Sequence, residues 1–287
     1  MAFVVFADGT ANLPRSLLDG IHLLPCEYTV DGVTHTYYGD VDRFDGHAFY
    51  EDLRHGRSVS TTLLNTQLFL SRFAPYLTQG KDVIYIAMSS GISGTYNAAR
   101  IAADELMDLY SGRFVHIVDS HGCGFGNGLL ALKAAELSAQ GLDAKEAAEI
   151  LDAEVPHTCQ YFTVDDLNFL KRTGRVSGMT AKIATVLNIK PILFGDSTGH
   201  IVSCAKVRGR RASIEAVAKK YEEKRIDGPE QKVFISHGDC LEDANTLAAL
   251  IRSITPDVPL TICQHEPFSG CHVGPGMLGL FFRGFER

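Results

Sequence analysis

Residues 83–112 read VIYIAMSSGISGTYNAARIAADELMDLYSG, and this stretch decides the fold class. A short apolar run is followed by a loop of serines and glycines and then by a long amphipathic pattern, which predicts a strand, a loop and a helix. Two more strands are expected in the same half, FVVF at 3–6 and FVHIVD at 114–119. Strands that alternate with helices predict β-α units on a largely parallel sheet.

The helices expected around these strands have the apolar spacing of amphipathic segments, and Asn65 is the expected N-cap of the second. They cover residues 43–56, 66–80, 93–112, 128–141 and 144–155. Pro156 follows them and indicates a break. The predicted architecture is therefore α/β with two domains, an N-terminal domain over 1–156 and a C-terminal domain over 157–287.

The sequence pattern of the second half differs from that of the first and predicts a mixed or antiparallel sheet. KPILFGDSTGHIVSCAKV at 190–207 predicts a hairpin that turns at Gly195–Gly199. A polar loop is expected at 167–178. The remaining expected strands are 159–164, 232–237 and 260–264, and the remaining helices are 179–188, 213–225 and 243–254.

Composition excludes several classes of protein. The chain has 287 residues, 45% of them hydrophobic, and a formal charge of −7. This acidic excess disfavours nucleic-acid binding, which needs clustered Lys and Arg. No run of about 18 apolar residues is present, so no transmembrane helix is expected. The N-terminus lacks the basic region of a secretory signal, and seven cysteines without a CxxC pair favour reduced thiols in the cytoplasm.

The SSGISGTYN loop at 89–97 has the features of an anion site. Gly91 and Gly94 permit a tight turn, and serine hydroxyls such as that of Ser93 stand beside a predicted helix N-terminus. Because the loop lacks the lysine of a P-loop, it suits a carboxylate better than a triphosphate. The competing interpretation is that Ser93 or Thr95 only caps the helix.

Two other loops are expected at the same edge of the sheet, VSTTLLN at 59–65 and VDSHGCGFGNG at 118–128. Asp119 could polarise hydroxyls of the loop at 59–65, or simply form a turn. The glycines spell GxGxxxG rather than the dinucleotide-binding GxGxxG, which weakens a Rossmann interpretation.

A second group lies near the C-terminus, where His272 precedes Gly274, Pro275 and Gly276. We expect a constrained loop that presents the imidazole to the first domain, where it could donate to a carboxylate. No metal is predicted, since His265, Cys271 and His272 lack a second ligand pair at zinc-site spacing. A serine hydrolase using Ser93, His272 and Asp119 ranks third among the candidate functions.

Taken together, these motifs resemble the DegV family of bacterial fatty-acid-binding proteins, and the similarity covers nearly the whole chain. Asp8 is followed by Gly9 where relatives have Asp-Ser, and LLN at 63–65 replaces Gln-Pro-Ser. The motifs that carry the resemblance are FADGTANLP at 6–14, Thr61-Thr62, SSGISGTYNAA at 89–99, VDSHGCGFGNG at 118–128, LNFLKRTGRVSG at 167–178, LNIKPIL at 187–193 and HVGPGMLGLFF at 272–282.

The resemblance implies that a long-chain fatty acid of the palmitate, stearate or oleate class lies in a tunnel between the two domains, with no cofactor. Its carboxylate would contact a hydroxyl of the Thr61-Thr62 pair, Ser93 with Gly94, and His272. Asp119, Arg172, Arg175 and Gly274 would support the head group or form a docking surface.

By the same resemblance the chain is a carrier and not an enzyme, and it presents the carboxylate to a separate fatty acid kinase for phospholipid synthesis. The alternative function is a phosphate-ligand or phosphoryl-transfer enzyme that uses the Ser/Gly-rich loop, because glycine-rich loops at helix starts also bind phosphate.

Overall fold

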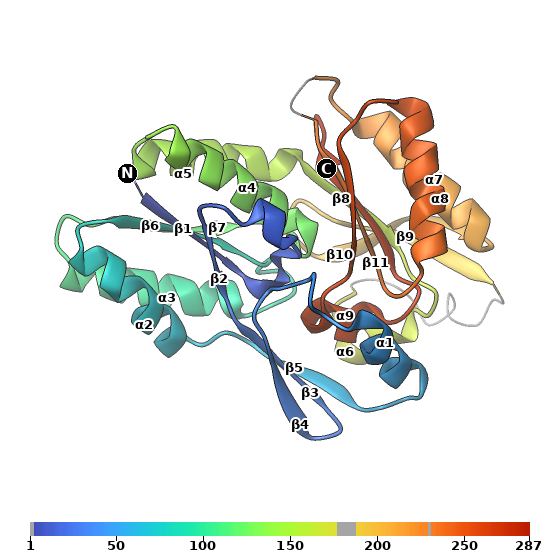
Figure 1. Cartoon of the computed structure of the whole chain (residues 1–287), viewed down its shortest axis with the longest axis horizontal. Helices are drawn as coiled ribbons and strands as arrows, with labels where there is room; N and C mark the ends of the chain where they lie inside the picture. Colours follow the sequence, from blue (N-terminus) through green and yellow to red (C-terminus); the bar gives the residue numbers. More distant parts are fainter. Residues whose placement is uncertain (1–2, 177–187, 229–230) are drawn as a thin grey trace.

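The computed structural model describes residues 3–176, 188–228 and 231–287 (Figure 1). Its helices and strands follow the chain in this order: β1 (Phe3–Asp8), β2 (Ile21–Leu24), β3 (Cys26–Val30), β4 (Val33–Tyr37), α1 (Gly46–Arg54), β5 (Val59–Thr62), α2 (Thr66–Thr78), β6 (Asp82–Ala87), α3 (Thr95–Leu109), β7 (Val115–Asp119), α4 (Phe125–Ala139), α5 (Ala144–Glu154), β8 (Thr158–Thr163), α6 (Asn168–Thr173), β9 (Ile189–Gly195), β10 (Ile201–Arg208), α7 (Arg210–Lys224), β11 (Val233–His237), α8 (Leu241–Ile254), β12 (Leu260–Gln264), α9 (Pro267–Val273) and β13 (Leu278–Arg283).

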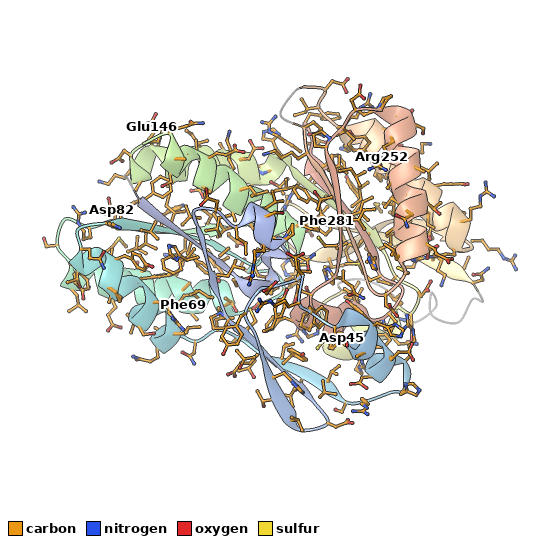
Figure 2. The ribbon with its side chains drawn as sticks, in the orientation of Figure 1. Asp45, Phe69, Asp82, Glu146, Arg252 and Phe281 are labelled. Carbon is orange, nitrogen blue, oxygen red and sulfur yellow. The ribbon has the colours of Figure 1, made fainter. Side chains whose placement is uncertain are left out.

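The first sheet is fully parallel and has the strand order β2-β1-β6-β7. Helices α4 and α5 cover one face, and α2 and α3 cover the other (Figure 1). Both faces are therefore buried, which explains why β1 and β6 read as continuous apolar runs rather than as alternating ones. Phe69 of α2 lies in the core on its face of the sheet (Figure 2).

The second sheet is mixed, with the order β10-β9-β8-β13-β11-β12, in which only β11 and β12 run parallel. The predicted hairpin at 190–207 is confirmed as β9 and β10. Helices α7 and α8 pack on one face of this sheet. The α/β class, with a parallel sheet followed by a separate mixed sheet, is thus confirmed.

The two sheets share part of one core. Phe125 of α4 stacks on Phe234 of β11, with ring centroids 4.6 Å apart, and also contacts the ring of Phe281. Phe281 lies in the interior between the two halves of the molecule (Figure 2). Helix α4 therefore packs on the parallel sheet and on the mixed sheet at once.

A third, three-stranded antiparallel sheet has the order β4-β3-β5 and contains Thr61 and Thr62. The expectation that residues 59–65 form a loop at the edge of the parallel sheet is therefore wrong. Strand β5 has only four residues and no buried side chain, so it carries almost no hydrophobic signal. The β3–β4 turn, Asp31-Gly32, does have a hairpin signature, and both residues have positive φ.

Two further expectations concern the second half. Residues 167–178, expected as a polar loop, contain the helix α6, which ends at Gly174 with φ +70°. The helix expected at 179–188 lies almost entirely outside the described residues, and the domain boundary at Pro156 stays a prediction. Among the described helices none is both long and apolar enough to cross a bilayer.

Candidate functional site

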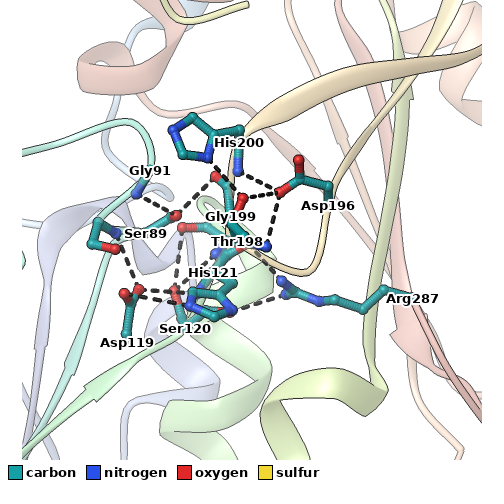
Figure 3. Close-up of polar contacts among 12 residues, drawn as sticks. Ser89, Gly91, Asp119, Ser120, His121, Asp196, Thr198, Gly199, His200 and Arg287 are labelled. Carbon is teal, nitrogen blue, oxygen red and sulfur yellow. Dashed lines mark hydrogen bonds and ion pairs between the residues drawn. The ribbon is translucent and has the colours of Figure 1, made fainter. Parts of the chain in front are cut away.

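The loop at 88–94 leaves the carboxyl end of β6 and is held against the β9–β10 hairpin. The fully buried Ser89 Oγ donates to the carbonyl oxygen of Gly199 at 2.9 Å and accepts from the Gly91 N–H at 3.1 Å (Figure 3). A Cβ on Gly91 would lie 2.6 Å from the backbone of Gly199, so the close approach requires glycine. The mixed sheet therefore fixes the position of this loop.

Asp119, at the end of β7, supports the same loop through its backbone. Its Oδ1 accepts from the N–H of Ser90 at 3.0 Å and from that of His121 at 3.2 Å (Figure 3). Burial alone would raise the pKa of Asp119, but hydrogen bonds from His121 and Ser90 outweigh it and lower the pKa. Asp119 thus stays ionised and holds both the backbone and the side chain of Ser90 together with His121, and none of its hydrogen bonds reaches residues 59–65.

Ser93 is half-buried where the loop meets α3. Its Oγ accepts from the N–H of Thr95 at 3.2 Å and donates to Thr95 Oγ1 at 3.0 Å. Ser93 therefore bonds the first residue of α3, although the N-cap position itself is Gly94 and has no side-chain cap. The O–H that points to Thr95 can turn to a ligand without breaking that bond, since a hydroxyl has one hydrogen and two lone pairs. Gly94, which follows, also lines the pocket described below.

Thr61 and His272 meet across 211 positions of sequence. Thr61 Oγ1 lies 3.1 Å from His272 Nε2, while His272 Nδ1 is buried and has no partner among the described residues. Burial, then the positive charges of Arg175 and Arg172, lower the pKa of His272 to about 4. The imidazole is neutral at pH 7, and when Thr61 donates to Nε2 the Nδ1–H remains free to donate.

Thr62 does not join this pair. Successive residues of a strand point to opposite faces, and Thr62 is exposed while Thr61 is half-buried. Of the two predicted hydroxyls, only that of Thr61 reaches His272.

His272 is on the helix α9 and not on a constrained loop, which corrects the expectation. Pro267 occupies the first turn, and the Glu266 carboxyl caps the helix by accepting from the N–H groups of Phe268 and Ser269. Gly274 ends the helix at φ +75° and ψ 178°, a conformation essentially restricted to glycine. A Cβ there would lie 2.4 Å from the ring of Phe169. Gly274 thus lets α6 pack on the helix that carries His272.

The two basic residues of the 167–178 segment differ in position. Arg175 lines the pocket and donates to the carbonyl oxygen of Thr173. Arg172 is exposed and stacks over the ring of Phe169, with its guanidinium carbon 4.7 Å from the centroid. Both are close enough to His272 to lower its pKa.

These groups surround a pocket of about 380 Å³. Thr61, Ser93, Gly94 and His272 line it, together with Arg175. A small void of about 30 Å³ with a mainly apolar surface adjoins it, and four side chains line both spaces: Ile92, Cys123, Ile201 and Val273. The pocket therefore continues along an apolar wall.

A second hollow, of about 690 Å³, is larger but has different chemistry. It is lined by Asp119, Asp152, Asp196 and Glu286, and among the described residues Arg287 is its one Lys or Arg side chain. The Arg287 guanidinium is already engaged by the carbonyl oxygens of Ser120, His121 and Thr158. This excess of carboxylates disfavours an anionic head group.

The serine hydrolase triad considered from the sequence is not assembled. Ser93 Oγ pairs with Thr95 rather than with His272, and Asp119 lines the other hollow, so the three residues form no hydrogen-bonded triad. In the described part of the chain, one group of side chains has metal-ligand spacing, His47, Glu51 and Asp239. Arg54 donates to both carboxylates of that group and supplies the positive charge that they need.

Sequence reasoning missed a buried polar cluster beside the pocket, formed by His265, Glu266 and Ser269. Ser269 lines the pocket. Burial raises the pKa of Glu266 to about 8, with a smaller contribution from Asp8, and lowers that of His265 to about 3. The available signal was the pair Glu266-Pro267, a cap followed by a first-turn proline, which predicts a helix start.

Comparison with known proteins gives one consistent family. The family model described as an uncharacterised protein of the DegV family matches residues 2–284. A DegV domain-containing protein of Clostridium perfringens is 36% identical over 98% of this chain and 97% of its own. The Bacillus subtilis structure described as DegV, a fatty acid binding protein, is 27% identical with a TM-score of 0.83 over 99% of both chains. A DegV lipid-binding protein of Thermotoga maritima is 25% identical, with a TM-score of 0.82 over 100% of both chains.

Proposed function

This chain belongs to the DegV family, and we propose that it binds one long-chain fatty acid, with the carboxylate held by Ser93, Gly94 and His272 and with Thr61 orienting the His272 imidazole. The observation that carries the proposal is the meeting of uncharged donors from three separate elements at one pocket, which continues along apolar side chains.

The neutral donors suit an acid whose affinity comes from its tail. Burying hydrocarbon is worth about 0.8 kcal/mol per CH₂, so a sixteen-carbon chain offers on the order of 10 kcal/mol before ordering costs. The head group then needs only enough hydrogen bonds to offset its desolvation. The free His272 Nδ1–H, the Ser93 hydroxyl and the Gly94 N–H at the start of α3 can supply them.

The acyl chain must enlarge the interior void, because about 30 Å³ holds little more than a water molecule. Ile92, Ile201 and Val273 line both spaces, and they move aside as the tail enters. Since the proposed tunnel runs between the two sheets, binding also fixes the relation of one sheet to the other.

The proposal includes a role as a cytoplasmic carrier without catalysis, which presents the carboxylate to a separate fatty acid kinase. Arg175 at the pocket and Arg172 beside it supply positive charge near the head group. A phosphorylating partner that brings a nucleotide would find complementary charge there.

The test begins with organic extraction of the purified protein and mass spectrometry, followed by titration of the delipidated protein with palmitate. We expect a co-purified fatty acid and saturable binding at one site. Stabilisation by ATP or a sugar phosphate, with none by palmitate, would favour the phosphate-ligand alternative and contradict the proposal.

Ser93→Ala is predicted to weaken palmitate binding by about 1 to 3 kcal/mol, because one buried head-group oxygen loses a partner. The matched control is Asn65→Ala. Asn65 caps α2 through the N–H of Leu68, so its loss costs helix stability at a position outside the pocket. Equal affinities of the two variants for palmitate would show that Ser93 is only a cap.

A further inference from the structure

Ser269 places a second hydroxyl in the wall of the pocket. It lines the pocket, is only 5% exposed, and lies three residues before His272 on α9. Residues three apart share one face of a helix, about 4.5 Å apart along its axis at a rise of 1.5 Å per residue. Ser269 is therefore one helical turn from the proposed carboxylate position.

The Ser269 hydroxyl belongs to a buried chain of polar groups. Its Oγ contacts Glu266 Oε1 and lies 3.1 Å from His265 Nε2, and His265 Nδ1 lies 3.1 Å from Ser236 Oγ. All four side chains are buried. The raised pKa of Glu266 and the lowered pKa of His265 keep both groups uncharged at pH 7.

The hydrogens of these four polar groups can be assigned by counting the donors and acceptors that each one has. Ser269 Oγ donates to Glu266 Oε1 and accepts from the His265 Nε2–H, and His265 Nδ1 accepts from the Ser236 hydroxyl. A hydroxyl has one hydrogen and two lone pairs, so Ser269 retains one unused lone pair. An ionised Glu266 would also leave one lone pair.

An unused acceptor cannot bind a carboxylate, which has no hydrogen to give. It can accept from a ligand hydroxyl. Ser269 lines the head-group pocket while His265 lines the small void that adjoins it, so both side chains stand where the first carbons of an acyl chain would pass.

We propose that the pocket selects fatty acids that carry a hydroxyl close to the carboxyl group, with that hydroxyl donating to Ser269 Oγ. The inference rests on the proposed function and narrows its ligand class. The one-turn spacing between Ser269 and His272 favours a β-hydroxy acid over an acid hydroxylated far along the tail.

The experiment is a competition among palmitate, β-hydroxypalmitate and ω-hydroxypalmitate for the delipidated wild-type protein. One added hydrogen bond predicts that β-hydroxypalmitate binds about three- to tenfold more tightly than palmitate. The ω-hydroxy acid should show no such gain, because its hydroxyl lies at the other end of the tail.

Ser269→Ala should abolish the preference while palmitate still binds, and Ser269→Thr, which keeps the hydroxyl, should retain it. Ser93→Ala is the matched control: it should weaken all three acids and leave their ranking unchanged. Equal wild-type affinity for palmitate and β-hydroxypalmitate would overturn this inference, and so would a preference that survives in Ser269→Ala. Either result would leave the proposed fatty-acid binding intact. Failure of every acid to bind would instead remove the proposed function.

Discussion

At the scale of single residues, the proposed head-group site uses donors that carry no formal charge. His272 is neutral because it is buried near Arg175 and Arg172, and Thr61 holds its Nε2. A neutral donor needs no counterion when the pocket is empty, whereas a buried charge without a partner would be costly. The two arginines supply attraction for an anion from a position beside the imidazole.

His272 should make the stability of the empty protein depend on pH. Its pKa is about 4 in the folded protein and about 6.5 in the unfolded chain, so the unfolded state binds more protons between these values. The stabilisation is therefore present above pH 6.5 and lost as the pH falls towards 4, by at most about 3 kcal/mol. Urea unfolding across this range should show a flatter profile for His272→Gln than for the wild type.

His265 remains in both proteins, so its own lowered pKa cancels in that comparison. Glu266 acts in the opposite direction, since its raised pKa gives stability that is present below about pH 4.5 and lost as the pH rises through 8. Parallel profiles for His272→Gln and wild type between pH 4 and 6.5 would contradict the assignment of His272.

At the scale of elements, α9 brings most of the site together, because it carries Ser269 and His272 and is capped by Glu266. Gly274 is predicted to be the critical residue for its end. Gly274→Ala places a Cβ against Phe169 in a conformation that disfavours alanine, and it should lower the free energy of unfolding by more than the roughly 1 to 2 kcal/mol of positive φ alone.

Gly112→Ala is the control for that variant. Gly112 has φ +82°, and no atom lies within 4 Å of the position that an alanine Cβ would take, so alanine there bears only the backbone cost. Chemical unfolding of both variants measures the difference. If Gly274→Ala is no more destabilising than Gly112→Ala, the packing of α6 on α9 is looser than described.

Some of these helices and strands could be predicted from the sequence and others could not. The three strands β1, β6 and β7 and the N-cap Asn65 were predicted because buried parallel strands are continuous apolar runs and caps have a specific residue preference. Strand β5 was not, because four residues with alternating exposure carry little signal. Helix α9 was missed because Gly274, Pro275 and Gly276, which directly follow it, read as a constrained loop around His272.

The residues of the site follow the same division. A loop beside a strand end pointed to Ser93, the Gly-Pro-Gly segment pointed to His272, and the family resemblance pointed to Thr61. The Thr61–His272 contact joins elements 211 positions apart and depends on the tertiary fold. Ser269 had no signal at all, since its role comes from two buried neighbours.

At the scale of the whole molecule, α4 links the parallel sheet to the mixed sheet through Phe125, Phe234 and Phe281. Phe125→Ala should lower the free energy of unfolding by about 3 to 5 kcal/mol. The shared core also predicts that the two sheets of the wild type unfold together. Urea unfolding followed by far-ultraviolet circular dichroism and by tyrosine fluorescence should therefore give one coincident transition in the wild type. Two separated wild-type transitions would contradict a shared core.

We propose that the fatty acid carboxylate binds beside Thr61, Ser93 and His272 and that the tail runs past Ile92 and Ile201. A crystal structure of the delipidated protein soaked with palmitate tests this most directly. We expect electron density for the carboxylate within hydrogen-bond distance of Ser93 and His272, with the tail between the two sheets. Palmitate found only in the larger hollow beside Asp119 and Arg287, or no bound palmitate at all, would contradict it.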